Sequence, residues 1–480
     1  MSASTIRTVN PATGTILAVF EALGPEQIED KLARAAEAFA AYRTTSFAER
    51  AQWLEGAADL LDREQRAAAR MMTVEMGKPV AQARGEAAKC AKAMRWFAAR
   101  AEQYLADESF PAEDVADAGA GEALVRYRPL GVVLAVMPWN FPMWQVVRFA
   151  APALMAGNAC LLKHASNVPQ TAQYLEDLFA RAGLPAAVFQ TLLVGSDRVE
   201  GLLRDPRVAA ATVTGSEGAG RAVASVAGDE VKKTVLELGG SDPFLVLPSA
   251  DVPAAARVAV TARVQNNGQS CIAAKRFIVH EAVYDEFADL FTQAMAQLRV
   301  GDPQKDETDV GPVASRQARK DLEELVDDAV SKGAKVLCGA ARPDDPALAN
   351  GSYYLPTVLA DVTPEMRIYR EETFGPVATL FKVAGLDEAV AVANDVPFGL
   401  SSNAWTRDEA ERRRLIRDLE AGAVFFNGMT ASHPALPFGG IKRSGYGREL
   451  SALGIREFCN ATTVWIAPEP AGAAAAESEV

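Results

Sequence analysis

The stretch that decides the fold is GVVLAVMPWNFPMWQVVRFAAPALMAGNACLLK, residues 131–163. It begins with a valine-rich apolar run at 131–136, continues with an apolar segment at 143–155 that is long enough for a helix, and ends in a second apolar run at 159–163. A strand, a helix and another strand in this order predict two parallel strands joined by a crossover helix.

The alternation continues on the C-terminal side, with a helical pattern at 169–182 and strand-like runs at 188–194 and 209–214. It predicts a doubly wound α/β sheet with helices on both faces. Paired glycines break the run TVLELGGSDPFLVL (234–247), and a second alternating α/β region extends from there to about residue 455. Upstream, residues 24–107 have apolar positions at helical spacing, which predicts helices at 31–42, 47–76 and 78–107.

Composition narrows the class of protein. The chain has 480 residues, 49% of them hydrophobic, and a formal net charge of −13. This acidic balance disfavours a nucleic-acid partner, and no apolar run approaches the length of a membrane span. The three histidines and five cysteines show no metal-ligand spacing. We therefore expect a globular protein without a metal, and the scattered cysteines favour a reducing cytoplasm.

Four short segments carry polar groups where α/β sheets place their sites. Asn140 lies in MPWNFP, directly after the first strand, although a rigid turn that caps the next helix explains it equally well. Gly215 and Ser216 open a helix after the strand at 209–214, a place that suits a phosphate. Glu237 is a carboxylate in an apolar strand, where burial would raise its pKa and make it a candidate base. Cys271 differs from the other cysteines because small and polar residues surround it.

Together these segments resemble the aldehyde dehydrogenase family. MPWNFP, LELGG, GQSC, EETFGPV (371–377) and PFGGIKRSGYGRE (437–449) occur in the family's order, and the resemblance extends over nearly the whole chain. It implies that Cys271 attacks an aldehyde, that Asn140 and the Cys271 backbone N–H bind the oxyanion, and that Glu237 activates water to hydrolyse the thioester left after hydride transfer.

The same resemblance implies a nicotinamide cofactor. The residues expected to bind it are Trp139, Lys163, Ser166, Gly215, Ser216, Glu372 and Phe374. Ser166 occupies a position where NAD-preferring members often have Glu. Because serine does not repel a 2′-phosphate, we predict that NADP is accepted and possibly preferred over NAD. His164 replaces the proline usual after Lys163, and its role is open.

Several segments are most similar to bacterial succinate-semialdehyde dehydrogenases. Such a substrate carries a carboxylate, so a cation is expected in the pocket. Arg148 is the candidate, because it follows Asn140 by eight residues and so lies on about the same helix face. Gln265 stands where other semialdehyde dehydrogenases have a second Arg, and Ser432 is a further candidate donor, with His433 beside it.

The resemblance also implies a domain plan: residues 1–107 and 129–238 as the NAD(P)-binding domain, 239–457 as the catalytic domain, 108–128 and 458–467 as a small β oligomerisation arm, and 468–480 as a tail. The arm predicts a homodimer or homotetramer. Two other functions stay open at this point. One is a broader aliphatic or aromatic aldehyde dehydrogenase, and the other is a cysteine esterase or thioesterase that needs no cofactor.

Overall fold

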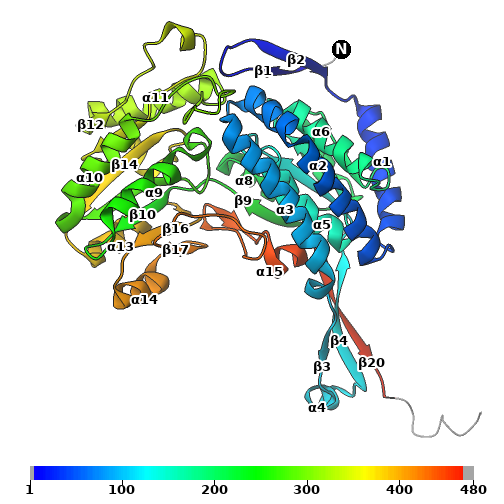
Figure 1. Cartoon of the computed structure of the whole chain (residues 1–480). Coiled ribbons are helices and arrows are strands. Elements are labelled where there is room, and N and C mark those ends of the chain that lie inside the picture. Colours follow the sequence, from blue (N-terminus) through cyan, green and yellow to red (C-terminus); the bar gives the residue numbers. More distant parts are fainter. Residues whose placement is uncertain (1–4, 469–480) are drawn as a thin grey trace, which may run out of the picture.

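The structure is a computed structural model that describes residues 5–468. Two α/β lobes lie side by side, and a thin β arm projects from one of them (Figure 1). Each lobe is built on one open sheet, and the chain passes from the first sheet to the second between β9 (Lys233–Glu237) and β10 (Asp242–Val246). The paired glycines at 239 and 240 lie in this connection, as the sequence predicts.

The first lobe has a six-stranded sheet in the order β19-β9-β8-β5-β6-β7. All its pairs are parallel except β19 with β9. The chain runs outward from β5 through β6 to β7 and then returns to β8 on the other side of β5, so the sheet is doubly wound and its switch point lies between β5 and β8. The strands are β5 (Val132–Met137), β6 (Ala159–His164), β7 (Phe189–Thr191), β8 (Val208–Thr214), β9 and β19 (Gly445–Tyr446).

Helices cover both faces of this sheet. Valine and alanine side chains of β5 alternate between two buried clusters, because successive residues of a strand point to opposite faces. One cluster is shared with α2, α3, α5 and α6, and the other with α1, α7 and α8. The bounds are α1 (Pro25–Tyr42), α2 (Phe47–Met76), α3 (Val80–Tyr104), α5 (Trp144–Ala156), α6 (Pro169–Arg181), α7 (Val199–Arg204) and α8 (Glu217–Asp229).

The second lobe has a seven-stranded sheet in the order β12-β13-β14-β11-β10-β16-β17, in which only β12 is antiparallel to its neighbour. Its strands are β10, β11 (Ala274–His280), β12 (Lys335–Cys338), β13 (Thr357–Ala360), β14 (Val377–Val383), β16 (Ser402–Trp405) and β17 (Val424–Phe426). Its helices are α9 (Val252–Val264), α10 (Glu281–Ala296), α11 (Arg316–Ser331), α12 (Arg367–Arg370), α13 (Leu386–Asn394) and α14 (Glu409–Asp418).

The arm is a three-stranded antiparallel sheet in the order β20-β4-β3. It consists of β3 (Glu108–Phe110), β4 (Glu122–Pro129) and β20 (Cys459–Ile466), with the short helix α4 (Ala112–Val115) at its tip (Figure 1). The late strand β20 pairs with β4, and its residue Cys459 lies opposite Pro129, which is 330 residues earlier in the chain. Most of the predicted tail, residues 469–480, lies outside the described residues.

Some elements differ from the sequence-based expectation. An N-terminal hairpin of β1 (Thr5–Val9) and β2 (Ile16–Glu21) has no counterpart in the prediction. The third helix begins at Val80 because Pro79 cannot lie inside a helix and Gly77 ends α2 at a φ of +84°. Among residues 5–468, no helix has the length and apolar character needed to cross a bilayer.

Candidate functional site

A pocket opens at the carboxyl ends of β5 and β8, where doubly wound sheets bind their ligands. Seven residues singled out in the sequence line it together: Trp139, Asn140, Gly215, Ser216, Cys271, Glu372 and Phe374. They come from both lobes, so the site is formed where the lobes meet. Lys163, Ser166, Arg148, Glu237, Gln265 and Ser432 do not line this pocket.

Cys271 follows a tightly held turn. Asn266, Asn267 and Gly268 all have left-handed backbone angles, with φ of +53°, +58° and +75°. The side chain of Asn267 fixes the turn by donating to the carbonyls of Gly77 (2.8 Å) and Pro312 (2.9 Å). Two successive left-handed asparagines are unfavourable on their own, and the buried side-chain hydrogen bonds of Asn267 hold the backbone before Cys271 in place.

Asn140 is connected to the same turn. Its side-chain amide nitrogen donates to the backbone carbonyl of Gln269 at 3.0 Å, and the backbone carbonyl of Asn140 accepts from Asn266 Nδ2 at 2.6 Å. The side chain is 3% exposed. These contacts place the Asn140 amide two residues from Cys271 along the turn, in the lining of the same pocket. The arrangement suits an amide that stabilises an oxyanion.

The Cys271 thiol is protonated at neutral pH. Burial raises its pKa to about 12, although the charges of Arg148 and Lys275 act in the opposite direction. Lys275 is buried on β11 and donates to the carbonyls of Ser270 (2.9 Å) and Cys271 (2.7 Å). Sequence reasoning did not find Lys275, although a lysine inside the apolar run of β11 is a usable signal. The attack on an aldehyde that the resemblance implies for Cys271 would therefore require a proton acceptor.

Glu237 ends β9 and is almost fully buried, at 2% exposure. Neither carboxylate oxygen has a hydrogen-bond partner among residues 5–468. Burial is the main cause that raises the pKa of Glu237 to about 8, and the nearby Glu449 carboxylate adds to the rise. A carboxyl group with this pKa loses its proton near neutral pH, as a general base must.

Arg148 forms a buried ion pair with Glu449 and donates to Thr214 Oγ1 at 3.2 Å. Its guanidinium also lies over the Phe438 ring, 4.6 Å from the centroid. The sequence assigned this arginine to the substrate carboxylate, but here its charge is balanced by Glu449. That Arg148 binds the substrate carboxylate remains a prediction. Its positive charge lies close enough to Glu237 to lower the pKa of that carboxyl group. Glu449, in the segment SGYGRE, was not assigned a role from the sequence.

The expected cofactor residues fit a nicotinamide dinucleotide. Ser216 caps α8, so the free backbone N–H groups of that helix face the pocket end of β8. Glu372 accepts from Gly240 N at 3.1 Å and pairs with Lys275. A Cβ on Gly239 would lie 2.5 Å from Glu372 Oε2, so a larger residue there would displace the Glu372 carboxylate. Trp139 and Phe374 meet edge to face at 5.7 Å and form an aromatic wall.

Lys163 is the last residue but one of β6, and Ser166 follows the strand in an exposed turn. Burial lowers the pKa of Lys163 from its usual value. Since β6 is the direct neighbour of β5, these residues lie at the same edge of the sheet as the pocket. Their part in binding a cofactor remains a prediction from the resemblance.

His164 supports the loop that carries Asn140. Its Nε2 contacts the Pro142 carbonyl at 2.8 Å, and Nδ1 accepts from Ala165 N at 2.9 Å. Burial lowers the pKa of His164 to about 4, so the ring is neutral at pH 7, with its proton on Nε2. His164, which replaces the usual proline, is therefore a buried residue whose hydrogen bonds stabilise the loop that carries Asn140.

The two remaining substrate candidates lie near α3. Gln265 precedes the nucleophile's turn, and its Nε2 atom is buried without a hydrogen-bond partner among the described residues. Ser432 is 8% exposed and accepts a hydrogen bond from Lys89 Nζ at 2.6 Å. Lys89 was not found by sequence reasoning, because one lysine on a helix rich in charged residues gives no distinguishing signal.

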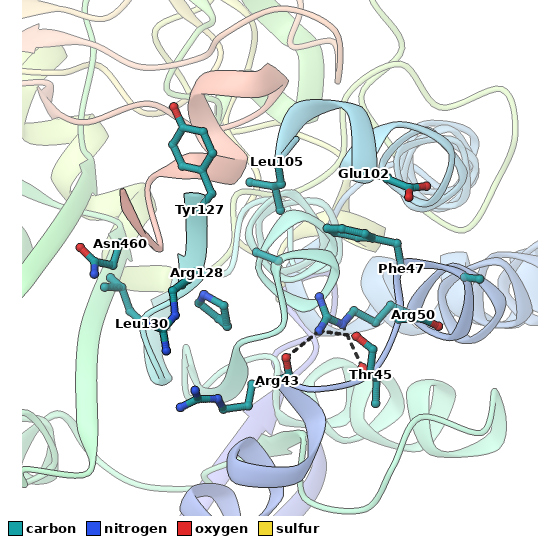
Figure 2. A pocket seen from close by; sticks show the side chains of 14 residues that line it. Arg43, Thr45, Phe47, Arg50, Glu102, Leu105, Tyr127, Arg128, Leu130 and Asn460 are labelled. Atoms are coloured by element: carbon teal, nitrogen blue, oxygen red, sulfur yellow. Dashed lines mark hydrogen bonds between the residues drawn. The ribbon is translucent and has the colours of Figure 1, made fainter. Parts of the chain in front are cut away.

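A second hollow lies at the base of the arm and is shown in Figure 2. It contains none of the residues predicted for the site. Arg50 is its most buried cation, and its guanidinium donates to the carbonyls of Arg43 (3.1 Å), Thr45 (2.8 Å) and Met155 (3.1 Å). These bonds close the turn between α1 and α2, so this arginine is used for structure.

Comparison with known proteins defines the class. The chain matches the sequence profile described as the aldehyde dehydrogenase family over residues 1–464. It belongs to that family.

Individual relatives narrow the comparison. The chain is 62% identical over 462 residues to succinate-semialdehyde dehydrogenase (NADP(+)) 1 of Mycobacterium tuberculosis, with 96% of this chain and 100% of the relative covered. It is 59% identical over 476 residues to succinate-semialdehyde dehydrogenase (NADP(+)) of Mycobacterium avium, with 99% of each covered. The crystal structure of succinic semialdehyde dehydrogenase from Streptococcus pyogenes in complex with NADP+ superposes with a TM-score of 0.92 at 36% identity, over 96% of this chain and 100% of that one. These matches confirm the fold expected from the sequence.

Proposed function

We propose that the chain oxidises succinate semialdehyde to succinate, with NADP as the preferred cofactor and NAD as the weaker one. The observation that carries the proposal is the pocket that brings Cys271 and Asn140 together with five of the seven expected cofactor residues. The proposal of substrate and cofactor is supported by the names of relatives that share 59% to 62% of their residues with this chain over nearly its whole length.

Catalysis starts at Cys271. Glu237 accepts the thiol proton, because its pKa of about 8 makes it a usable base in a site where the thiol is protonated. The sulfur then attacks the aldehyde carbon, and the Asn140 amide and the Cys271 backbone N–H stabilise the oxyanion. The nicotinamide cofactor, when bound, supplies the hydride acceptor that converts the thiohemiacetal on Cys271 into a thioester.

Hydrolysis of the thioester returns the enzyme to its starting state. Glu237 first releases the thiol proton to solvent and then removes a proton from water, whose oxygen attacks the thioester carbonyl; the Cys271 thiolate leaves and takes that proton from Glu237. Arg148 and Glu449 set the charge around this base, because Arg148 lowers and Glu449 raises the pKa of Glu237. The buried position of Glu237 excludes bulk water from the carboxylate and keeps its pKa near neutrality.

An aldehyde panel tests this function. We expect kcat/KM to be highest for succinate semialdehyde with NADP, lower with NAD, and at least about tenfold lower for an uncharged aldehyde of similar length. Faster turnover of uncharged aldehydes would favour the broader aldehyde dehydrogenase. Hydrolysis of activated esters at a comparable rate without any cofactor would favour the cysteine esterase.

Ser166 tests the cofactor preference. We expect Ser166→Glu to raise the KM for NADP by about 10- to 100-fold, because a carboxylate repels the 2′-phosphate, and to leave the KM for NAD nearly unchanged. Ser166→Gln is the control, since it has the same shape without the charge. Equal losses in the two variants would mean that size, and not charge, acts at this position.

The arm is the basis of a second proposal, a homodimer or homotetramer. Its outer strands β3 and β20 have free edges in the described chain, and Phe110, Trp465 and Ile466 are 48%, 50% and 49% exposed. A small sheet with open edges and exposed aromatic side chains is suited to pair with another subunit. The five cysteines are all free, which fits the cytoplasmic location that we propose.

A further inference from the structure

Three buried or half-buried cations gather where α3 packs against the start of α5: Lys78, Lys89 and Arg148. Two of them have carboxylate partners. Lys78 pairs with Glu86 and Arg148 pairs with Glu449, and all four of these side chains are at most 4% exposed. Among residues 5–468, no carboxylate oxygen lies within 4.0 Å of Lys89 Nζ. The cluster therefore has three cations but only two carboxylate partners, and Lys89 is the cation without one.

The other contacts of Lys89 do not neutralise its charge. Its ammonium donates to Ser432 Oγ at 2.6 Å and lies 4.1 Å from the centroid of the Trp144 ring. Burial, together with repulsion by Arg148, lowers the pKa of Lys89 to about 8. A partly desolvated ammonium without a counterion is unfavourable, and a carboxylate from solution would relieve it. The side chain is only half-buried, so a small molecule can reach it.

Lys89 lies on the face of α3 that contacts the turn at residues 266–268, before Cys271. Gln82, seven residues earlier on α3, accepts from the backbone N–H of Asn266 at 2.6 Å, so this face of α3 touches the turn before Cys271. Lys89 therefore lies about 10 Å further along α3 than Gln82. Because helix side chains tilt toward the helix N-terminus, the Lys89 ammonium lies closer to the turn before Cys271 than its Cα does. Trp144, under the ammonium, immediately precedes Gln145, which lines the pocket with Cys271.

We propose that Lys89 is the cation that binds the carboxylate of the aldehyde substrate, with Ser432 as its partner. The ammonium has three N–H donors and uses one on Ser432, while the Ser432 proton stays free to donate. A carboxylate can accept from both groups at once, and the unpartnered Gln265 Nε2 on the neighbouring turn is a further donor. Lys89 takes the anchoring part that the sequence assigned to Arg148. The inference rests on the proposed function.

Lys89→Met tests the proposal, because methionine keeps an unbranched apolar stem against Trp144 and removes only the charge. The two substrates are succinate semialdehyde and its methyl ester, which differ in the carboxylate alone. We expect the ratio of their kcat/KM values to fall about 10- to 100-fold, mainly through a higher KM for succinate semialdehyde. Lys89→Arg should restore most of the ratio. Lys92→Met, which removes an exposed lysine from the same helix, is the matched control.

The outcomes separate this inference from the function on which it rests. If the wild-type protein does not prefer succinate semialdehyde to the ester, the proposed function fails. If the wild type has the preference and Lys89→Met keeps it, or loses activity toward both substrates equally, the assignment of Lys89 is overturned. Loss of the preference in Arg148→Met but not in Lys89→Met would return the anchor to Arg148.

Discussion

We expect Cys271→Ser to lower the rate of NADP reduction with succinate semialdehyde by about three orders of magnitude or more. A serine hydroxyl ionises far less readily than a thiol, and no base in the described site is strong enough to activate it. Residues from both lobes line the pocket around Cys271. The substitution only replaces sulfur by oxygen, so it should leave their contacts in place. The measurement is the initial rate of absorbance growth from reduced NADP, with saturating aldehyde.

Cys338→Ser is the matched control for this prediction. Cys338 is also a half-buried free cysteine, but it lies on β12, at the far edge of the seven-stranded sheet. It should keep full activity. A Cys271→Ser protein that binds NADP, unfolds at the wild-type temperature and still reduces NADP at a tenth of the normal rate or more would contradict the assignment of the nucleophile.

Glu237→Gln separates the two halves of the reaction. Glutamine has nearly the same shape but cannot accept a proton, so at neutral pH both the deprotonation of Cys271 and the hydrolysis should slow, and kcat should fall by about 10²- to 10⁴-fold. Above about pH 9, where more of Cys271 ionises without this base, the thioester should form and then persist. We expect the wild-type rate to rise with pH through about 8, because the base acts only after it loses its proton and the folded protein raises its pKa to about 8. The variant should lose this rise. Stopped-flow absorbance over a pH series measures both effects.

If Glu237 instead served only to pack the end of β9, the variant would slow without a change in its pH profile. A variant that also fails to form the thioester, even when the pH is raised well above 9, would show that Glu237 is required for deprotonation of Cys271 more than for hydrolysis. That result would make deprotonation of Cys271, and not activation of water, the main role of Glu237.

Much of the fold follows from local patterns in the sequence. The run at 131–163 predicts β5, α5 and β6 because a buried parallel strand is apolar throughout, whereas a crossover helix is longer and rich in alanine. The helix expected at 47–76 matches α2 because Ser46 caps its start and Gly77 ends it. The hairpin at β1 and β2 was missed because its residues alternate only weakly between apolar and polar.

The site was less predictable, because its charges are balanced by residues distant in sequence. Asn140 and Cys271 could be paired from the motifs, and the structure places both in one pocket. The expectation that Arg148 shares a helix face with Asn140 was wrong, because α5 begins at Trp144 and Asn140 lies in the loop before it. Glu449, the partner of Arg148, follows β19, whose pairing with β9 joins two strands more than 200 residues apart. Lys89 was missed for the same reason, because its contact with Ser432 joins two residues that are 343 positions apart in the sequence.

The central claim is that Cys271 carries the acyl group between two half-reactions controlled by Glu237. The most direct measurement is mass spectrometry of Glu237→Gln protein that is incubated above about pH 9 with succinate semialdehyde and NADP, quenched and then digested. The account predicts a succinyl group on the peptide that contains Cys271, formed only when NADP is present. A succinyl group on any other cysteine, or acylation of Cys271 without the cofactor, would contradict it.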